Sequence, residues 1–260
     1  MAIFRYPGGK TKLAPAIAAE ARDYAFFAEP FVGGGSVFSR VLTDTDCVVL
    51  INDLDPLMGA FWSIVFGDDD AFEGLAHMVE STPISMDTFN HMRAHEPQSA
   101  LERAFAALFF NRTTFSGIRT SGPIGGYAQS GKYTVDCRFN SARVLGDMRR
   151  IREYRSRVHV YSEDFEVFLS RVPADGFVYA DPPYYVKGDA LYPEKMTDAD
   201  HARLAQCLRE RSFLLSYDVH PRILELYTPW AEVGDVQLLY TMTGSNRKNQ
   251  KQTEYLIRNR

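Results

Sequence analysis

Phe177-Val178-Tyr179-Ala180-Asp181-Pro182-Pro183-Tyr184 is a short apolar run that ends abruptly in an acid, two prolines and a tyrosine. Such a run predicts a buried strand followed at once by a loop. The acid then lies at the carboxyl end of a strand, which is the edge where open α/β sheets bind their ligands. A carboxylate, a proline carbonyl and an aromatic ring at that edge suit a planar group that carries an exocyclic amine.

Acids also follow the other strands that the sequence predicts. If the sheet is parallel, all of these carboxylates line one edge. Buried carboxylates are costly without partners, so this edge is expected to bind a ligand with hydroxyls or amines. In chain order the strand-end acids are Glu29, Asp53, Asp164, Asp181 and Asp218.

A glycine-rich loop, Phe31-Val32-Gly33-Gly34-Gly35-Ser36, follows the first predicted strand and opens a helix. Glycines such as Gly33 and Gly35 let a ligand approach the backbone next to the amides of a helix N-terminus. Asp53, about twenty residues further on, is a partner for ribose hydroxyls. Together they favour a cofactor that contains a nucleoside. Gly8-Gly9-Lys10-Thr11 is not a P-loop, because the first glycine and the preceding strand are missing.

The order of the elements predicts one α/β domain with an insertion. An α/β pattern stops after residue 56, a helical pattern follows to about residue 110, and the α/β pattern returns at residue 158. We therefore predict a doubly wound, mostly parallel sheet from residues 1–56 and 158–260, and a mainly helical recognition insertion at 57–157 with a loop or hairpin at 113–140. The predicted strands are 25–28, 47–51, 158–161, 177–180 and 213–216, with an antiparallel pair at 237–241 and 253–257.

Positive charge gathers in two segments of a chain whose formal net charge is −4. Residues 112–157 contain ten Lys or Arg and three Asp or Glu, whereas residues 247–260 contain five and one. Such segments predict a surface for a polyanion, since phosphate contacts supply most non-specific affinity for nucleic acid. For residues 149–157 alone, a solvated basic helix stays an equal alternative.

The composition disfavours several other classes of protein. The 260 residues are 45% hydrophobic, which suits a large core. No window reaches the roughly 18 consecutive apolar residues of a spanning helix, so we expect a soluble, cytoplasmic protein without a membrane partner. Three scattered cysteines form no CxxC pair, and the histidines lack HExxH spacing. Asp68-Asp69-Asp70 is interpreted as the start of a helix, and no catalytic metal is expected.

A series of short motifs covers nearly the whole chain. In order, they are Tyr6-Pro7-Gly8-Gly9-Lys10, Glu29 to Phe38, Asn52-Asp53, Asn111-Arg112, Phe115-Ser116-Gly117, Asp164-Phe165 and Asp181 to Tyr184. Together they resemble the motifs of the Dam-type (D12 class) DNA adenine-N6 methyltransferases. The cofactor motif comes first, the recognition region second and the catalytic motif last, which is the order of that family's alpha group. The same order accounts for the insertion at residues 57–157.

The resemblance implies S-adenosylmethionine as the methyl donor and double-stranded DNA as the substrate. Matched to the family, Tyr6 and Lys10 would lie near the methionine part of the cofactor and the glycine loop beneath it. Asp53 would hold the ribose hydroxyls, Asp164 and Phe165 would contact the cofactor's adenine, and Asp181 would face both the methionine and the target base. The cofactor residues implied are therefore Tyr6, Lys10, Phe31, Gly33, Gly35, Asp53, Asp164, Phe165 and Asp181.

Methylation of an adenine amine can be argued from the residues themselves. The amine is a poor nucleophile because its lone pair is delocalised into the ring, so a catalyst must favour the tetrahedral amine. The Asp181 carboxylate and the Pro182 carbonyl can accept both N–H bonds, an interaction that strengthens in the transition state. Tyr184 offers a stacking face to an adenine flipped out of the duplex. The predicted catalytic residues are Asp181, Pro182, Pro183 and Tyr184.

The middle segment carries the predicted DNA contacts. Arg119 is a candidate for a bidentate contact with guanine, and three other basic side chains are candidates for phosphate contacts. The segment lacks the Arg-Tyr-Asn and Phe-Asn-Val-Pro sequences of relatives that read GATC, so a different recognition sequence is expected. The predicted set is Asn111, Arg112, Arg119, Lys132 and Arg138.

Three other functions stay open. Cytosine-N4 methylation uses the same amine chemistry, although that class more often has Ser in place of Asp181. RNA methylation is the second alternative, and a catalytically inactive DNA-binding module, disfavoured by the intact cofactor motifs, is the third. A cognate restriction endonuclease is a candidate partner, and the oligomeric state is left open.

Overall fold

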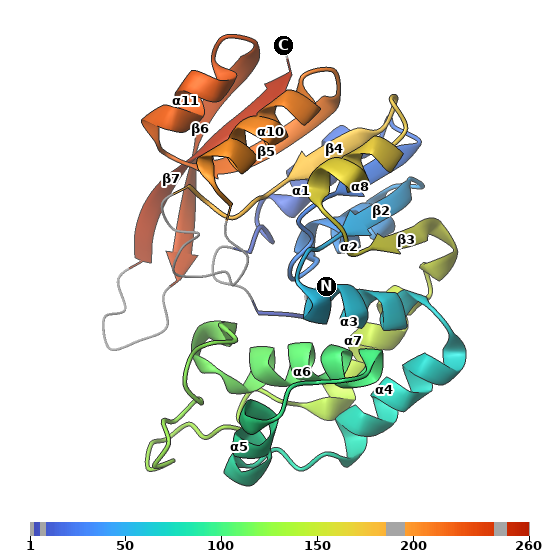
Figure 1. Cartoon of the computed structure of the whole chain (residues 1–260), viewed down its shortest axis with the longest axis vertical. Coiled ribbons are helices and arrows are strands. Elements are labelled where there is room, and N and C mark those ends of the chain that lie inside the picture. Colours follow the sequence, from blue (N-terminus) through green and yellow to red (C-terminus); the bar gives the residue numbers. More distant parts are fainter. Residues whose placement is uncertain (1–2, 6–8, 186–195, 242–248, 260) are drawn as a thin grey trace.

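The computed structural model describes residues 3–5, 9–185, 196–241 and 249–259, without the side chains of 238–241 and 249–252. Seven strands form one sheet in the order β3-β2-β1-β4-β5-β7-β6 (Figure 1). The strands are β3 (Val158–Tyr161), β2 (Val48–Asn52), β1 (Phe26–Glu29), β4 (Phe177–Ala180), β5 (Ser212–Asp218), β7 (Asn249–Asn259) and β6 (Ala231–Thr241).

The sheet is mostly parallel, as predicted. Every pairing from β3 to β5 is parallel, and β7 is antiparallel to both β5 and β6. The predicted antiparallel pair therefore exists, with strands of eleven residues each. Because β1, β2, β4 and β5 run in the same direction, the acids that follow them are brought to one edge of the sheet.

Helices cover both faces of the sheet because the strands are apolar on both sides. Phe27 and Val49 belong to an apolar cluster with α1 (Ala14–Ala21), α2 (Ser36–Asp44) and α3 (Pro56–Phe66). Their neighbours Ala28 and Leu50 point to the other face, since side chains alternate along a strand. They belong to a second cluster with α8 (Phe165–Arg171), α10 (Asp198–Leu208) and α11 (Pro221–Tyr227).

Most of the segment predicted as an insertion is helical. Figure 1 shows α4 (Asp69–Ser81), α5 (Met86–Ala94) and α6 (Ala100–Thr113) below the sheet, followed along the chain by α7 (Ser141–Arg152). The predicted loop at 113–140 contains two short features, the 3-10 turn Phe115–Gly117 and an isolated bridge between Thr114 and Pro123. A second short 3-10 turn, Arg155–Arg157, leads into β3.

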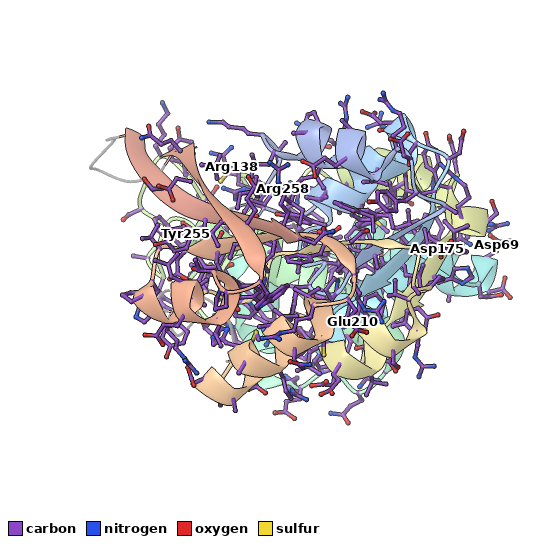
Figure 2. All side chains as sticks on the ribbon, turned by 90° about the horizontal axis from the view of Figure 1, so that it is seen from above. Asp69, Arg138, Asp175, Glu210, Tyr255 and Arg258 are labelled. Carbon is purple, nitrogen blue, oxygen red and sulfur yellow. The ribbon has the colours of Figure 1, made fainter. Side chains whose placement is uncertain are left out.

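The apolar core of these helices is continuous with the core on one face of the sheet. Phe61 and Trp62 of α3, Phe105 and Phe109 of α6, and Met148 of α7 all belong to the cluster that contains Phe27 and Val49. Seen from above, Tyr255 of β7 lies toward one end of the molecule and Asp69 toward the opposite end (Figure 2). The helical segment is therefore packed onto the sheet domain.

The acidic triplet at residues 68–70 starts a helix, as interpreted from the sequence. The Asp68 side chain accepts hydrogen bonds from the backbone N–H groups of Asp70 and Ala71 and so caps α4. Among the described helices, none combines the length and the apolar character needed to cross a membrane.

Candidate active site

A cavity of about 410 Å³ opens at the carboxyl ends of β1, β2 and β4. Its wall contains the glycine loop, four of the five predicted strand-end acids and Lys10. Asp218, the fifth acid, is absent from the lining, although it lies at the end of the adjacent strand β5. The strand-end pattern therefore predicted the location of the cavity correctly.

Lys10 connects the N-terminal segment to the Asp181–Tyr184 motif. Its ammonium lies 2.9 Å from Oδ1 of Asp181 and donates a 2.7 Å hydrogen bond to the Tyr184 hydroxyl. It also lies 5.1 Å from the centre of the Tyr184 ring. Burial raises the pKa of Asp181, whereas the Lys10 ammonium lowers it. Asp181 and Tyr184 are thus held side by side by one buried cation.

The glycine loop has the backbone conformation that its sequence requires. Gly33 and Gly35 adopt φ values of 43° and 70°, a region that other residues rarely enter. A Cβ on Gly35 would also collide with the rings of Phe38 and Trp62. The Trp62 indole donates a 3.2 Å hydrogen bond to the Gly33 carbonyl, which fixes the loop from below.

Two of the strand-end acids support this loop directly. Oδ2 of Asp53 accepts a 2.8 Å hydrogen bond from the Gly33 N–H, and its Oδ1 accepts one from the Asp55 N–H. Glu29 is buried, and its Oε2 accepts a 2.9 Å hydrogen bond from the Phe38 N–H in the first turn of α2. Burial raises the pKa of Glu29 well above its ordinary value. Glu29 therefore anchors the helix that the loop opens.

An aromatic wall lines the cavity, formed by Phe31 of the glycine loop and Phe165 of α8. The rings of Phe31 and Phe165 lie 5.7 Å apart, and the Arg203 guanidinium lies 4.7 Å from the centre of the Phe165 ring. Arg203 also forms a 3.0 Å ion pair with Asp164, which caps α8 through the Glu166 N–H. Both residues predicted at the cofactor's adenine are thus joined by Arg203, which the sequence analysis missed because nothing local marks it.

Asp218 holds the chain immediately after the Asp181–Tyr184 motif. Its Oδ1 accepts a 3.0 Å hydrogen bond from the Tyr185 N–H. The Tyr185 ring stacks on His220 at 4.3 Å and lies 5.0 Å from His201. Sequence reasoning missed these two histidines as supports, since neither belongs to a recognisable motif. They help to position Tyr185 and therefore the end of the motif.

Asn111 is hydrogen-bonded to the backbone of the N-terminal segment. It is buried, donates a 2.8 Å hydrogen bond to the Arg5 carbonyl and accepts one of 2.8 Å from the Arg5 N–H. The neighbouring Arg112 donates to the Ile3 carbonyl. These hydrogen bonds tie the N-terminal segment to α6, and Asn111 also lines the cavity. The assignment of Asn111 and Arg112 as DNA contacts stays a prediction.

The other predicted DNA-contact residues lie in different environments. Arg119 lines the cavity and lies 3.7 Å from Asp55, whereas Lys132 and Arg138 (labelled in Figure 2) are exposed on the loop before α7. Tyr6, predicted at the methionine part of the cofactor, lies outside the described residues.

Known proteins resemble this chain along most of its length. The family model described as D12 class N6 adenine-specific DNA methyltransferase matches residues 6–242. The Type II methyltransferase M1.LlaDCHI of Lactococcus lactis subsp. cremoris is 23% identical over 98% of this chain and 94% of its own length. The Type II methyltransferase M.MjaIII of Methanocaldococcus jannaschii is 23% identical over 71% of this chain and 68% of its own. The DNA N-6-adenine-methyltransferase of Escherichia phage P1 is 26% identical over 70% of this chain and 24% of its own.

Proposed function

Because the chain belongs to the D12 class N6 adenine-specific DNA methyltransferases, we propose that its cavity binds S-adenosylmethionine beside a flipped adenine. The observation that carries this proposal is the meeting of the glycine loop and the Asp181–Tyr184 motif in one cavity at the sheet edge. The cofactor would supply an electrophilic methyl group at that point.

The residues present fit this cofactor. A volume of about 410 Å³ suits a nucleoside with an amino acid tail. The open backbone at Gly33 and Gly35 allows close approach, the Phe31 and Phe165 rings offer apolar faces to a base, and the cavity's carboxylates suit a sulfonium cation. The Asp53 carboxylate would accept hydrogen bonds from both the Gly33 N–H and the ribose hydroxyls. Each carboxylate oxygen can accept more than one hydrogen bond, so both sets of donors can be accommodated.

We assign the reacting amine to the Asp181–Tyr184 motif. The Asp181 carboxylate and the Pro182 carbonyl would accept the two N–H bonds of the target amine, and Pro183 would keep the turn rigid. The Tyr184 ring would stack on the flipped base, which offsets part of the unstacking free energy by roughly 1–3 kcal/mol. Acceptors on the amine favour its tetrahedral form and therefore lower the barrier to attack.

We also propose that Arg119, Lys132 and Arg138 contact DNA. Lys132 and Arg138 are exposed on a basic loop, which favours phosphate contacts. Arg119 reaches the cavity from the same segment, so it is suited to a base near the target. The Type II names of two relatives favour a restriction–modification role, which resistance of the modified DNA to a cognate endonuclease would test.

One experiment tests the central proposal. S-adenosylmethionine is titrated into the purified protein by calorimetry, and cofactor with a labelled methyl group is then incubated with duplex DNA and with RNA. We expect cofactor binding, labelled duplex DNA and N6-methyladenine as the product nucleoside. N4-methylcytosine or labelled RNA would replace the proposed substrate, and absence of cofactor binding and label would leave an inactive DNA-binding module. Single-molecule sequencing of the methylated DNA would identify the sequence context.

A further inference from the structure

Glu254 lies beside the Asp181–Tyr184 motif although it belongs to β7, a strand paired with β5 on one side and β6 on the other. Its Oε2 is 3.6 Å from the Lys10 ammonium, and the two side chains are 2% and 3% exposed. Lys10 therefore has two carboxylates around it, Asp181 at 2.9 Å and Glu254 at 3.6 Å. These three residues come from the N-terminal segment, the loop after β4 and strand β7.

This arrangement places two carboxylates, one buried and one partly buried, beside one buried ammonium. Glu29, also buried, interacts electrostatically with Asp181, and burial raises the pKa of Glu29. A buried carboxylate is costly unless a structural or functional partner compensates it. The Glu254 carboxylate lies within 3.6 Å of the ammonium that contacts Asp181, so its charge acts on the Asp181–Tyr184 motif through Lys10.

Lys10 occupies the groups that the target adenine would need. The ammonium contacts the Asp181 carboxylate and the Tyr184 hydroxyl, and it lies over the Tyr184 ring. An incoming amine must therefore compete with Lys10 for Asp181. A second carboxylate on the far side of the ammonium weakens its hold on Asp181, because the two anions share one cation.

We propose that Glu254 is a positioning residue that draws the Lys10 ammonium away from Asp181, so that the Asp181 carboxylate stays available to accept the target amine. This inference rests on the proposed function. Lys10 keeps the Tyr184 hydroxyl and the Glu254 carboxylate as partners while Asp181 turns to the substrate. Without the Glu254 charge, the Lys10 ammonium binds the Asp181 carboxylate more tightly. The target amine then competes less well for that carboxylate.

The pH dependence of turnover distinguishes this role from a purely structural one. The groups that influence Asp181 come from every neighbouring element: Lys10, Glu29 of β1, Tyr179 of β4, Tyr184, Tyr217 of β5 and Glu254 of β7. Glu254 raises the pKa of Asp181 and Lys10 lowers it. Since Asp181 must be ionised to accept the amine, the acid limb of kcat moves to lower pH without Glu254 and to higher pH without Lys10.

The test compares Glu254→Gln with the wild-type enzyme. We expect kcat to fall by roughly 10- to 100-fold, the loss seen when a metal-binding side chain loses the partner that orients it, taken here as the scale for a positioning residue. KM for S-adenosylmethionine and for DNA should stay unchanged, and the acid limb of kcat should move to lower pH. Lys10→Met should move the acid limb in the opposite direction. A lower maximum of kcat together with an acid limb that extends to lower pH is a result that simple loss of folded protein does not produce.

Two further variants keep the test decisive. Glu232→Gln removes an exposed carboxylate from the adjacent strand β6, where it pairs with Arg258, and should leave both kcat and the pH profile unchanged. Glu254→Asp retains the charge and should keep the wild-type acid limb with a smaller loss of kcat, which provides the readout if Glu254→Gln does not fold. Wild-type kcat and acid limb in Glu254→Gln, or a loss of kcat without any pH shift, would overturn the inference. A wild-type protein that fails to methylate DNA would instead overturn the proposed function.

Discussion

Tyr184 is the side chain for which the proposed chemistry and the observed contacts coincide most closely. Its hydroxyl accepts a hydrogen bond from Lys10, and its ring lies 6.4 Å from the buried ring of Tyr217. These contacts hold the ring in one orientation before any base arrives. A stacking platform that is ordered in advance loses less conformational entropy on binding.

Replacement of Tyr184 by alanine should abolish methyl transfer. The flipped base loses a stacking partner worth roughly 1–3 kcal/mol as well as its orientation toward the methyl donor. Binding of S-adenosylmethionine, measured by calorimetry, should be nearly unchanged because the glycine loop and the aromatic wall are intact. Tyr184→Phe is the matched control: it retains the ring, loses only the hydrogen bond from Lys10 and should keep most of the activity. Methylation by Tyr184→Ala at the wild-type rate would disprove the stacking role.

At the level of elements, the loop between β1 and α2 shows how a local sequence and distant packing combine. The glycines permit the turn, whereas Trp62 of α3 and Asp53 after β2 fix it in place. The loop is therefore a preformed part of the cavity. Its shape depends on the absence of a side chain at Gly35.

Gly35→Ala should weaken both the fold and cofactor binding. Alanine is strained at φ 70°, and its Cβ would collide with the Phe38 and Trp62 rings. We expect a loss of roughly 1–3 kcal/mol in the free energy of unfolding, measured by denaturant titration. Gly146→Ala is the control: it lies within α7, nothing lies within 4 Å of its added Cβ, and alanine in a helix should stabilise by about 0.5–1 kcal/mol. Equal stability of the two variants would contradict the account of the loop.

Arg203 of α10 connects this helix to α8 through ion pairs. Its guanidinium bridges Asp164, Glu166 and Asp200 and covers the Phe165 ring. Arg203→Gln should weaken binding of S-adenosylmethionine by about tenfold, or roughly 1.4 kcal/mol, because the aromatic wall loses its support. The measurement is calorimetric titration of the cofactor. Arg40→Gln breaks the exposed ion pair with Asp44 on α2 and should bind the cofactor as the wild type does. Equal affinity in both variants would show that Arg203 does not support cofactor binding.

The whole molecule joins a sheet domain to a helical segment through one continuous apolar core. Asn111 and Arg112 add polar connections from α6 to the N-terminal residues Ile3 and Arg5. The N-terminal segment also carries Lys10 into the cavity. The helical segment and the sheet domain that carries the Asp181–Tyr184 motif are therefore joined by one packed core, which suits the proposed binding of DNA beside the cavity.

Removal of Lys132 or Arg138 should weaken binding to all DNA sequences alike. Each substitution to alanine removes a proposed phosphate contact, so the salt dependence of log K should become shallower by about one. Arg119→Ala should instead relax the preference at one base position. Fluorescence anisotropy across a salt series measures both effects. Arg209→Ala, beside α10 on the opposite face of the sheet, is the control; an equal change there would mean that the charge effect is general.

Much of the candidate site can be predicted from the sequence, whereas contacts between distant residues cannot. Glu29, Asp53, Asp164 and Asp181 reach the cavity as predicted, because a strand end and its direction can be read locally. The hydrogen bonds between Asn111 and the Arg5 backbone could not be predicted, because the two residues are more than a hundred positions apart in the sequence. Arg203 was missed because its importance arises from three acids on two helices.

By itself, the sequence determined the strands, the helices and the edge at which the acids gather. Hydrophobic periodicity, glycines and prolines act within a few residues, so these features need no knowledge of distant contacts. Only the tertiary structure decided that β7 lies between β5 and β6, and that Glu254 thereby comes within 3.6 Å of Lys10. The electrostatic environment of Asp181 depends on groups from both ends of the chain, and such pairings form only when long-range burial selects one arrangement.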